Sequence, residues 1–442
     1  MNIYDLGFIY FSVGKEKEQF MNRDIDNKFA GNTFLGMIDF FLRLFYYLFH
    51  SPFLYKKNLK KDNAVLIYGE SVNNRNTLLP ILKELGDERV IDLHSHKQYP
   101  KWRMYWYAIP HLGELFKEIK KASQEKKDTI KNFFAKFWMM YGCNKTAGQL
   151  LDFYKPQALV VANDHLPFHR SLMQEANLRG IPTIYVQHAA VTEQFPPLQF
   201  KYSLLDGEDS YLKYKSREET SGKIFLCGGI RFDAIREIKF GKPQKTTVGV
   251  AINLVDNEQI VKDTCLTIRD SKINNESCEV VLRPHPQMNL EMWKGWCDQN
   301  KIGFSLAKEE SSFAFISRIT VLISNQSSIH LDAAMCHTPS VVYGLSTVEL
   351  GDSYSFVKNH LTKRAEDMES LLQFIADSGN LEPDTEAVKY YNCSYGSNYE
   401  GHVARMMADL IENILKGDDN PFIEKYGFEI KESTDSRIVY KV

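Results

Sequence analysis

The sequence predicts an α/β fold of two domains, each a parallel sheet covered by helices on both faces. Short apolar runs, such as residues 64–68 and 90–93, alternate with amphipathic stretches, as in strand–helix–strand units. The 442 residues are too many for one ordinary core, and 44% hydrophobic with 25% charged residues is a globular composition. The polar residues 241–245 interrupt the alternation and are interpreted as a linker between the domains.

The first domain is expected over residues 63–240, with an aromatic and helical insertion after its second strand. The second domain is expected over residues 246–380, and residues 381–442 are predicted to be a helical extension whose helix at 402–416 packs back on the first domain. The predicted strands are residues 64–68, 90–93, 158–162, 183–186, 202–207 and 223–229 in the first domain, and 247–253, 279–282, 319–323 and 340–343 in the second.

Residues 1–62 form a separate N-terminal segment that contains an aromatic-rich stretch at 34–49. Asp39 and Arg43 interrupt this stretch at helical spacing, and it is short for a membrane span. Pro52 ends it, and Lys56, Lys57, Lys60 and Lys61 follow. Two interpretations are open: an interfacial helix with a basic flank, which would give peripheral membrane contact, or a helix packed on the first domain. We favour the packed helix, because an amphipathic aromatic helix more often belongs to a core.

Charge and cysteine usage exclude several function classes. The chain has 54 basic and 56 acidic residues and a formal net charge of −2, so no overall field favours nucleic acid. Its seven cysteines are scattered without a C-x-x-C pair, which predicts reduced thiols and no metal site. The first residues lack a basic start and a cleavage site, so a cytoplasmic location is expected, with the inner face of the membrane as the alternative.

Two strand ends in the second domain carry residues suited to binding an anion. One predicted strand leads into Arg283-Pro284-His285-Pro286, and another leads into a Ser/Asn-rich turn and a helix. Backbone N–H groups, hydroxyls and a helix start at such a turn favour a phosphate. Asn253, which ends the first strand of this domain, is expected either to contact the nucleotide or to cap the following helix. The candidate residues of the turn and helix are Ser324, Asn325, Gln326, Ser327, Ser328 and Asp332.

The first domain offers Asp164 and His188 at the ends of two successive predicted strands. In a parallel sheet these residues would lie at one edge, within reach of one cleft. Either is an acid–base candidate for deprotonating an acceptor hydroxyl, and Asp164 is the better nucleophile if a covalent adduct forms. The structural alternative for Asp164 is a cap on the helix that begins near Pro167. His165 and His169 are interpreted as surface or loop histidines.

These motifs, taken in order, resemble the GT-B superfamily of glycosyltransferases, particularly bacterial surface-polysaccharide enzymes. The resemblance rests on His188, a Gly228-Gly229 turn that runs to Asp233, Arg283-Pro284-His285-Pro286, and residues 324–332, and it covers residues 158–343. Similar runs occur in teichoic-acid glycerophosphotransferases, capsule and lipopolysaccharide Kdo transferases, and bacterial sialyltransferases. The resemblance implies two Rossmann-like domains that face each other across a cleft, as in the GT-B fold.

The resemblance also implies roles. Ser327, Ser328 and the helix start would hold the donor phosphate, His285 and Arg283 would neutralise the leaving nucleotide, and Asp332 matches an acidic residue of the teichoic-acid enzymes. The implied donor is a CMP-linked acidic sugar, Kdo or a sialic-acid-like sugar, and the implied acceptor is a surface glycan or glycolipid, with no cofactor and no metal. Three alternatives remain: a CDP-glycerol-type polyol-phosphate transferase, a UDP-sugar 2-epimerase, and a non-catalytic nucleotide-binding scaffold.

Overall fold

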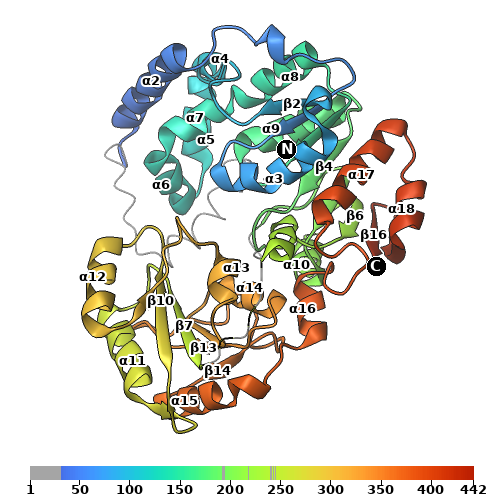
Figure 1. Ribbon diagram of the computed structural model, residues 1–442. Helices are drawn as coiled ribbons and strands as arrows, with labels where there is room; N and C mark the ends of the chain where they lie inside the picture. The colour runs from blue at the N-terminus through green and yellow to red at the C-terminus, as the bar shows by residue number, and fades with distance from the viewer. Residues whose placement is uncertain (1–30, 192–194, 218, 239–240, 242, 244) are drawn as a thin grey trace. The chain divides into compact units, whose positions relative to one another are not determined.

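The computed structural model describes residues 31–191, 195–217, 219–238, 241, 243 and 245–442 (Figure 1). The chain divides into two compact units. Unit 1 comprises residues 1–230 and 402–442, and unit 2 comprises residues 231–401. The chain thus returns to unit 1 at His402, later than the predicted boundary at residue 381. Residues 1–30 of the predicted N-terminal segment lie outside the described residues.

Unit 1 is built on an eight-stranded sheet in the order β15-β16-β6-β5-β4-β3-β1-β2, in which only β15 runs antiparallel to its neighbour. Strands β1, β3, β4 and β5 are buried along their whole length, which explains their continuous apolar sequences. The strands are β1 (Val65–Tyr68), β2 (Val90–Leu93), β3 (Ala158–Val161), β4 (Thr183–Val186), β5 (Tyr202–Leu205), β6 (Gly222–Leu226), β15 (Glu429–Ser433) and β16 (Arg437–Lys441).

The helices of unit 1 pack in pairs as well as on the sheet. Helix α8 contacts α9, α17 contacts α3, and α2 contacts both α4 and α7. The α-helices are α2 (Thr33–His50), α3 (Val72–Leu85), α4 (Trp102–Ala108), α5 (Leu112–Lys121), α6 (Gln124–Asn132), α7 (Phe134–Met140), α8 (Cys143–Tyr154), α9 (Pro167–Leu178), α10 (Glu208–Lys215), α17 (Val403–Lys416) and α18 (Asn420–Tyr426). Short 3-10 helices lie at Lys57–Leu59, Asp87–Arg89 and Ile109–His111.

Unit 2 has a six-stranded parallel sheet in the order β11-β10-β7-β12-β13-β14 and a separate two-stranded hairpin. The strands are β7 (Thr247–Ile252), β8 (Lys272–Ile273), β9 (Glu276–Ser277), β10 (Glu279–Pro284), β11 (Gly303–Phe304), β12 (Val321–Ser324), β13 (Ser340–Tyr343) and β14 (Lys363–Ala365). The helices are α11 (Glu258–Asp270), α12 (Leu290–Asn300), α13 (Ser312–Ile316), α14 (Ile329–Met335), α15 (Met368–Asp377) and α16 (Thr385–Tyr391), with 3-10 turns at Ile230–Glu237 and Ser378–Asn380.

The alternation of side chains along β7 divides the core of unit 2 into two layers. Val248, Val250 and Ile252 pack with α11, α12 and α15, whereas Ala251 packs with α13, α14 and α16 on the other face. Gly249 lies on this second face, where an added Cβ would come within 2.5 Å of Ile319 Cδ1. Glycine therefore permits the close approach of α13. Helices cover both faces, and the prediction of two Rossmann-like α/β domains is confirmed.

Each sheet has one point at which the strand order reverses. In unit 1 the chain builds β1 and β2 in one direction and then β3 to β6 in the other, so the reversal lies between β1 and β3. In unit 2 the corresponding reversal lies between β7 and β12. Open α/β sheets bind ligands outside the carboxyl ends of the strands at such a reversal. Each unit therefore has one preferred place for a site.

The C-terminal extension differs from the predicted helical one, because it ends in two strands. β16 pairs parallel with β6 and extends the sheet, and β15 pairs antiparallel with β16 at the edge. Charged side chains dominate residues 429–437, so the sequence shows no apolar strand pattern there. Charged residues are nevertheless common in exposed edge strands. Within the described ranges, no helix is long and apolar enough to cross a membrane.

Candidate functional site

A polar network joins the loops that follow β7 and β12 in unit 2. Asn253 Nδ2 donates to the carbonyl oxygen of Gln326 at 3.1 Å. The carboxylate of Asp256 accepts from the Asn253 backbone N–H at 2.6 Å and from Asn325 Nδ2 at 3.0 Å. Asn253 therefore bridges the two strand ends, while Asn257 caps α11 through its side-chain oxygen. These loops flank the strand-order reversal of unit 2.

Buried side chains also hydrogen-bond to the backbone near the β12 loop. Ser324 Oγ donates to the carbonyl oxygen of Ala251 at 2.8 Å, and His330 Nε2 lies 3.0 Å from the carbonyl oxygen of Asn325. His330 is fully buried, and burial lowers its pKa to about 4, so the imidazole is neutral near pH 7. A neutral ring with Nε2 protonated donates this bond. The loop is therefore fixed in position without a ligand.

The loop itself carries polar side chains at Gln326, Ser327 and Ser328. Gln326 Nε2 is buried and makes no hydrogen bond with any described residue. Ser328 is exposed, and although it precedes α14 its side chain does not cap the helix. The Ser327 hydroxyl accepts a long, 3.4 Å hydrogen bond from the N–H of Ile329. Buried donors in folded proteins are normally paired. Gln326 Nε2, which has no partner among the described residues, is therefore a candidate donor to a ligand.

Arg283 lies in β10, next to β7, and His285 directly follows this strand, but the environments of the two side chains differ. His285 is half-buried, and its Nδ1 accepts from the N–H of Gln287 at 3.3 Å. Arg283 is buried and donates to Ser305 Oγ at 2.6 Å and to the carbonyl oxygen of Glu310 at 2.9 Å. Burial lowers the pKa of Arg283. The arginine thus secures the loop after β11, and His285 is the more accessible of the two.

Asp332 lies on α14 as predicted, and it forms an ion pair within unit 2. Its Oδ1 accepts from Arg231 Nη1 at 2.6 Å, and the carboxylate side chain is only 8% exposed. Arg231 belongs to the turn after β6 that contributes to the family resemblance. Asp332 therefore balances the charge of Arg231, which fits this arrangement better than direct contact with a donor.

In unit 1, Asp164 lies at the centre of a buried hydrogen-bonded group after β3. Its Oδ1 is 3.0 Å from His165 Nδ1, and its Oδ2 accepts from the Tyr214 hydroxyl at 2.7 Å. Tyr214 in turn lies 3.3 Å from the Tyr185 hydroxyl. Asp164 does not cap α9, whose N-cap residue is Leu166 and has no side-chain cap bond. In the turn before the helix, Asn163 Oδ1 accepts from the N–H groups of His165 and Leu166. Asp164 is 0% exposed, which favours orienting His165 over contacting a sugar.

The charge of Asp164 determines the state of His165. Burial by itself would raise the pKa of Asp164, but the bonds from His165 and Tyr214 and the charge of Arg170 outweigh it, so this pKa lies below its ordinary value. An ionised carboxylate only accepts hydrogen bonds, so His165 Nδ1 carries the proton of this bond, and in the neutral tautomer Nε2 is the nitrogen with the lone pair. This is the arrangement of a histidine oriented by a carboxylate.

Two further histidines belong to the same edge of the sheet. His169 is 1% exposed, neither of its ring nitrogens bonds to a described residue, and burial, followed by the charges of His165, His188 and Lys101, lowers its pKa well below the ordinary value. His188 follows β4 and is half-buried. The sequence interpretation missed His165 and His169, although the Asp164-His165 pair directly after a buried strand was a usable signal.

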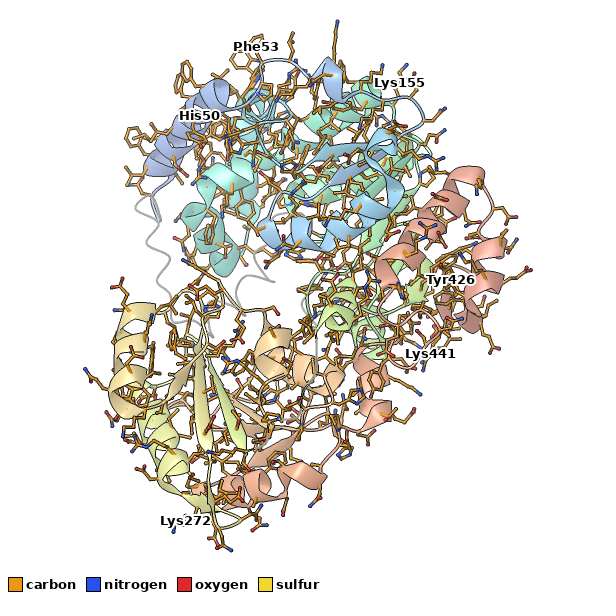
Figure 2. All side chains as sticks on the ribbon, viewed as in Figure 1. His50, Phe53, Lys155, Lys272, Tyr426 and Lys441 are labelled. Atoms are coloured by element: carbon orange, nitrogen blue, oxygen red, sulfur yellow. The ribbon has the colours of Figure 1, made fainter. Side chains whose placement is uncertain are left out.

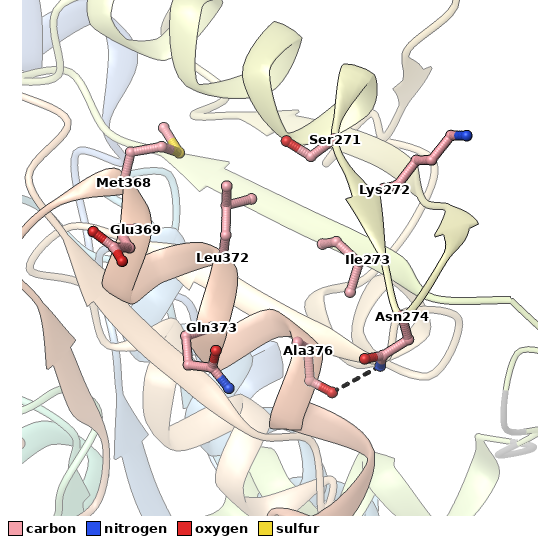
Figure 3. A pocket seen from close by; sticks show the side chains of 9 residues that line it. All are labelled: Ser271, Lys272, Ile273, Asn274, Met368, Glu369, Leu372, Gln373 and Ala376. Atoms are coloured by element: carbon pink, nitrogen blue, oxygen red, sulfur yellow. Dashed lines mark hydrogen bonds between the residues drawn. The ribbon is translucent and has the colours of Figure 1, made fainter.

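A surface hollow of unit 2 lies elsewhere and contains none of the predicted site residues. It is formed by the segment after α11 and by α15, and Asn274 Nδ2 donates to the carbonyl oxygen of Ala376 across it at 3.1 Å (Figure 3). Among the described residues, no three His, Cys, Asp or Glu side chains are grouped so as to hold a metal ion.

Comparisons with known proteins find similarity in structure only. No family model matches the chain, and no curated protein matches its sequence. A solved structure described as a putative UDP-N-acetylglucosamine 2-epimerase from Listeria monocytogenes is 10% identical, covers 81% of this chain and 98% of its own, and has a TM-score of 0.49. The structure of the Neisseria meningitidis UDP-GlcNAc 2-epimerase bound to UDP-GlcNAc is 13% identical, covers 80% of this chain and 99% of its own, and has a TM-score of 0.49. The structure of the wall teichoic acid polymerase TagF is 10% identical, covers 87% of this chain and 98% of its own, and has a TM-score of 0.43.

Proposed function

We propose that this protein is a glycosyltransferase that moves a sugar from a nucleotide-activated donor to a bacterial surface polysaccharide or glycolipid. The proposed donor is a CMP-linked acidic sugar of the Kdo or sialic-acid type. The choice of CMP rests on the resemblance of Arg283-Pro284-His285-Pro286 and residues 324–332 to the motifs of transferases that use such donors. A cytoplasmic location fits a nucleotide-linked donor.

The observation that carries the proposal is the loop after β12. Its backbone is fixed by Asn325, Asp256 and His330, while the Gln326 amide lacks a partner and the Ser328 hydroxyl is exposed. A preformed set of donors at a strand-order reversal suits the phosphate of a nucleotide. His285, at the end of the β10 strand two positions away from β12, would add a donor to the same phosphate.

In the proposed reaction, unit 2 holds the donor and His165 of unit 1 activates the acceptor. His165 Nε2 takes the proton from an acceptor hydroxyl, whose oxygen forms a bond to the anomeric carbon of the donor sugar. The bond between that carbon and the phosphate oxygen breaks, and CMP leaves. Asp164 is assigned a positioning role, because it fixes the tautomer and orientation of His165. His188 remains the second acid–base candidate.

A thermal-shift panel of CMP, CDP, UDP and GDP tests the donor site, because a ligand that binds only the folded state raises the unfolding temperature. We expect stabilisation by CMP and a smaller effect in the Ser328→Ala variant. A matched control is Ser353→Ala, an exposed serine of the same unit whose loss should leave the CMP effect unchanged.

Each other outcome points to a named alternative. Preference for CDP would favour a polyol-phosphate transferase, and preference for UDP would favour a UDP-sugar enzyme. No stabilisation by any nucleotide would contradict a donor site in unit 2.

A further inference from the structure

Helix α2 of unit 1 is apolar on two opposite faces, and only one of them is packed. Its buried residues, Gly36, Phe40 and Leu44, lie four positions apart and form one seam. Phe40 stacks on Trp138 of α7 with ring centroids 3.8 Å apart, and Tyr47 stacks on Tyr105 of α4 at 5.6 Å. The seam accounts for the packed-helix interpretation, which is correct for this face.

The opposite face of α2 and the turn after it expose large apolar side chains. Of the sixteen exposed large hydrophobic residues among those described, nine lie between Phe34 and Leu54. Phe49 is 83% exposed and Phe53 is 66% exposed, and Figure 2 shows side chains projecting from α2 near the labelled His50 and Phe53. We define this outer face by Phe34, Phe41, Leu42, Phe45, Phe49, Phe53 and Leu54. Single exposed hydrophobic residues scattered over a surface are normal, but a cluster on one element indicates an interaction surface.

The chain that follows α2 is basic up to Lys61. Asp39 is neutralised by Arg43, whose Nε lies 2.9 Å from the carboxylate. Beyond this pair, the charged residues that follow α2 are lysines up to Lys61, and Lys56, Lys57 and Lys60 are exposed. The segment is therefore basic although the whole chain carries a formal net charge of −2.

We infer that the outer face of α2, with the lysine run that follows it, docks this protein on an anionic phospholipid bilayer. Aromatic and leucine side chains enter the boundary between headgroups and acyl chains, and flanking lysines attract anionic headgroups. The helix lies in the interface and does not span it. The inference concerns a surface separate from the donor and acceptor residues, so it stands or falls independently of the proposed function.

The test is flotation of the full chain with vesicles of phosphatidylcholine alone and with vesicles that also contain phosphatidylglycerol. We expect binding to the anionic vesicles, weaker binding to the neutral ones, and release at roughly 1 M salt, where the Debye length is about 3 Å. The Lys56→Gln/Lys57→Gln/Lys60→Gln variant should bind roughly a hundredfold more weakly. The Phe45→Ser/Phe49→Ser variant should lose at least about tenfold per side chain.

Matched controls separate this surface from general stickiness and from misfolding. Leu178→Ser removes an 80% exposed leucine from another helix of unit 1, and Lys272→Gln/Lys294→Gln/Lys308→Gln removes three exposed lysines of unit 2. Both controls should bind like the wild type, and the thermal unfolding midpoints of all variants should agree. All substituted side chains are exposed, so folding should be kept.

Three results would overturn the inference. They are failure of the full chain to float with either vesicle, loss of binding in the control variants as strong as in the α2 variants, and self-association without lipid that sedimentation detects and that Phe45→Ser/Phe49→Ser abolishes. The last result would assign the outer face to a second copy of the chain.

Discussion

His165 and Asp164 form a pair in which the histidine is nearly enclosed and the aspartate is completely buried. Because Asp164 accepts from both His165 and Tyr214, its negative charge is compensated inside the protein. In the proposed reaction, His165 Nε2 is the base. The same carboxylate cannot at once support the ring and attack a sugar. Under the proposed function, the pairing therefore favours His165 as a base over Asp164 as a nucleophile.

Replacement of His165 by alanine should remove the proton acceptor and leave the donor site intact. We expect the transfer rate to fall by about 10²- to 10⁴-fold, with CMP affinity unchanged, when CMP release and CMP binding are measured separately. His111→Ala, a histidine of unit 1 outside this group, is the control. An unchanged rate would exclude His165 as the base.

Replacement of Asp164 by asparagine should act through the tautomer of His165. An asparagine amide that donates to Nδ1 would place the ring proton on Nε2, where the lone pair is needed. We expect a large fall in kcat with little change in donor KM and an altered pH–rate profile, while Asp152→Asn, an exposed carboxylate of the same unit, has no effect. A pH–rate profile identical to the wild type would argue against a positioning role.

His330 should make the stability of the protein depend on pH. Its pKa of about 4 in the folded state lies below the ordinary 6.5, so between these values the unfolded chain binds a proton that the folded chain does not. Stability should therefore fall as the pH drops from 6.5 towards 4, by about 3 kcal/mol for this group. Urea unfolding across this range should show a smaller slope in His330→Gln, with exposed His337→Asn as the control. An equal slope in all three proteins would contradict the assignment; the buried His169 contributes in the same direction in each.

Sequence reasoning at the residue scale located strand ends better than side-chain roles. Asn253 and the residues after β12 follow neighbouring strands of unit 2, and Asp164 follows β3 of unit 1, because apolar runs reveal where buried strands stop. The partners of Arg283 and Asp332 were hidden, since Ser305, Glu310 and Arg231 approach them only through the fold. Burial of His169 was equally invisible in a polar stretch of sequence.

At the scale of elements, the β12 loop combines a fixed backbone with donors that lack protein partners. Removing the Gln326 amide should cost no hydrogen bond in the free protein, because Nε2 has none with any described residue. We expect Gln326→Leu to keep or raise the unfolding temperature while it weakens CMP binding by about tenfold or more. Isothermal titration and thermal unfolding measure the two effects. A joint loss of stability and binding would instead indicate a structural role for the amide.

The elements that escaped prediction share a physical cause. β14, β15 and β16 are short and rich in charged residues, so their apolar pattern is weak. β14 pairs with β13 at the edge of the unit 2 sheet, and β16 pairs with β6 and carries β15 at the edge of the unit 1 sheet. The helical insertion expected after the second strand is divided among several short helices, α6, α7 and α8 among them. Gly142 lies between α7 and α8, where an added Cβ would come within 1.8 Å of the carbonyl oxygen of Met104. That close packing cannot be inferred from helical periodicity.

At the scale of the whole molecule, both units repeat one plan. Each has a parallel sheet whose strand order reverses once, and in each the polar candidates follow the strands on either side of the reversal or next to it. The two-domain organisation was predictable because the length of the chain and the composition of the linker reflect the size of each core. The α/β class was predictable because the alternation of apolar runs and amphipathic stretches reflects the type of sheet. The choice of nucleotide was not predictable from these features, since the same strand ends suit any phosphate.

The most direct test of the proposed function is mass analysis of the products formed from CMP-Kdo and CMP-sialic acid with bacterial surface glycan as acceptor. We predict release of CMP together with an acceptor mass gain of one acidic sugar and no phosphate, and loss of both signals in His165→Ala. An acceptor that gains a phosphate-containing group only when CDP-glycerol is supplied, or a nucleotide sugar that is isomerised without transfer, would contradict the account.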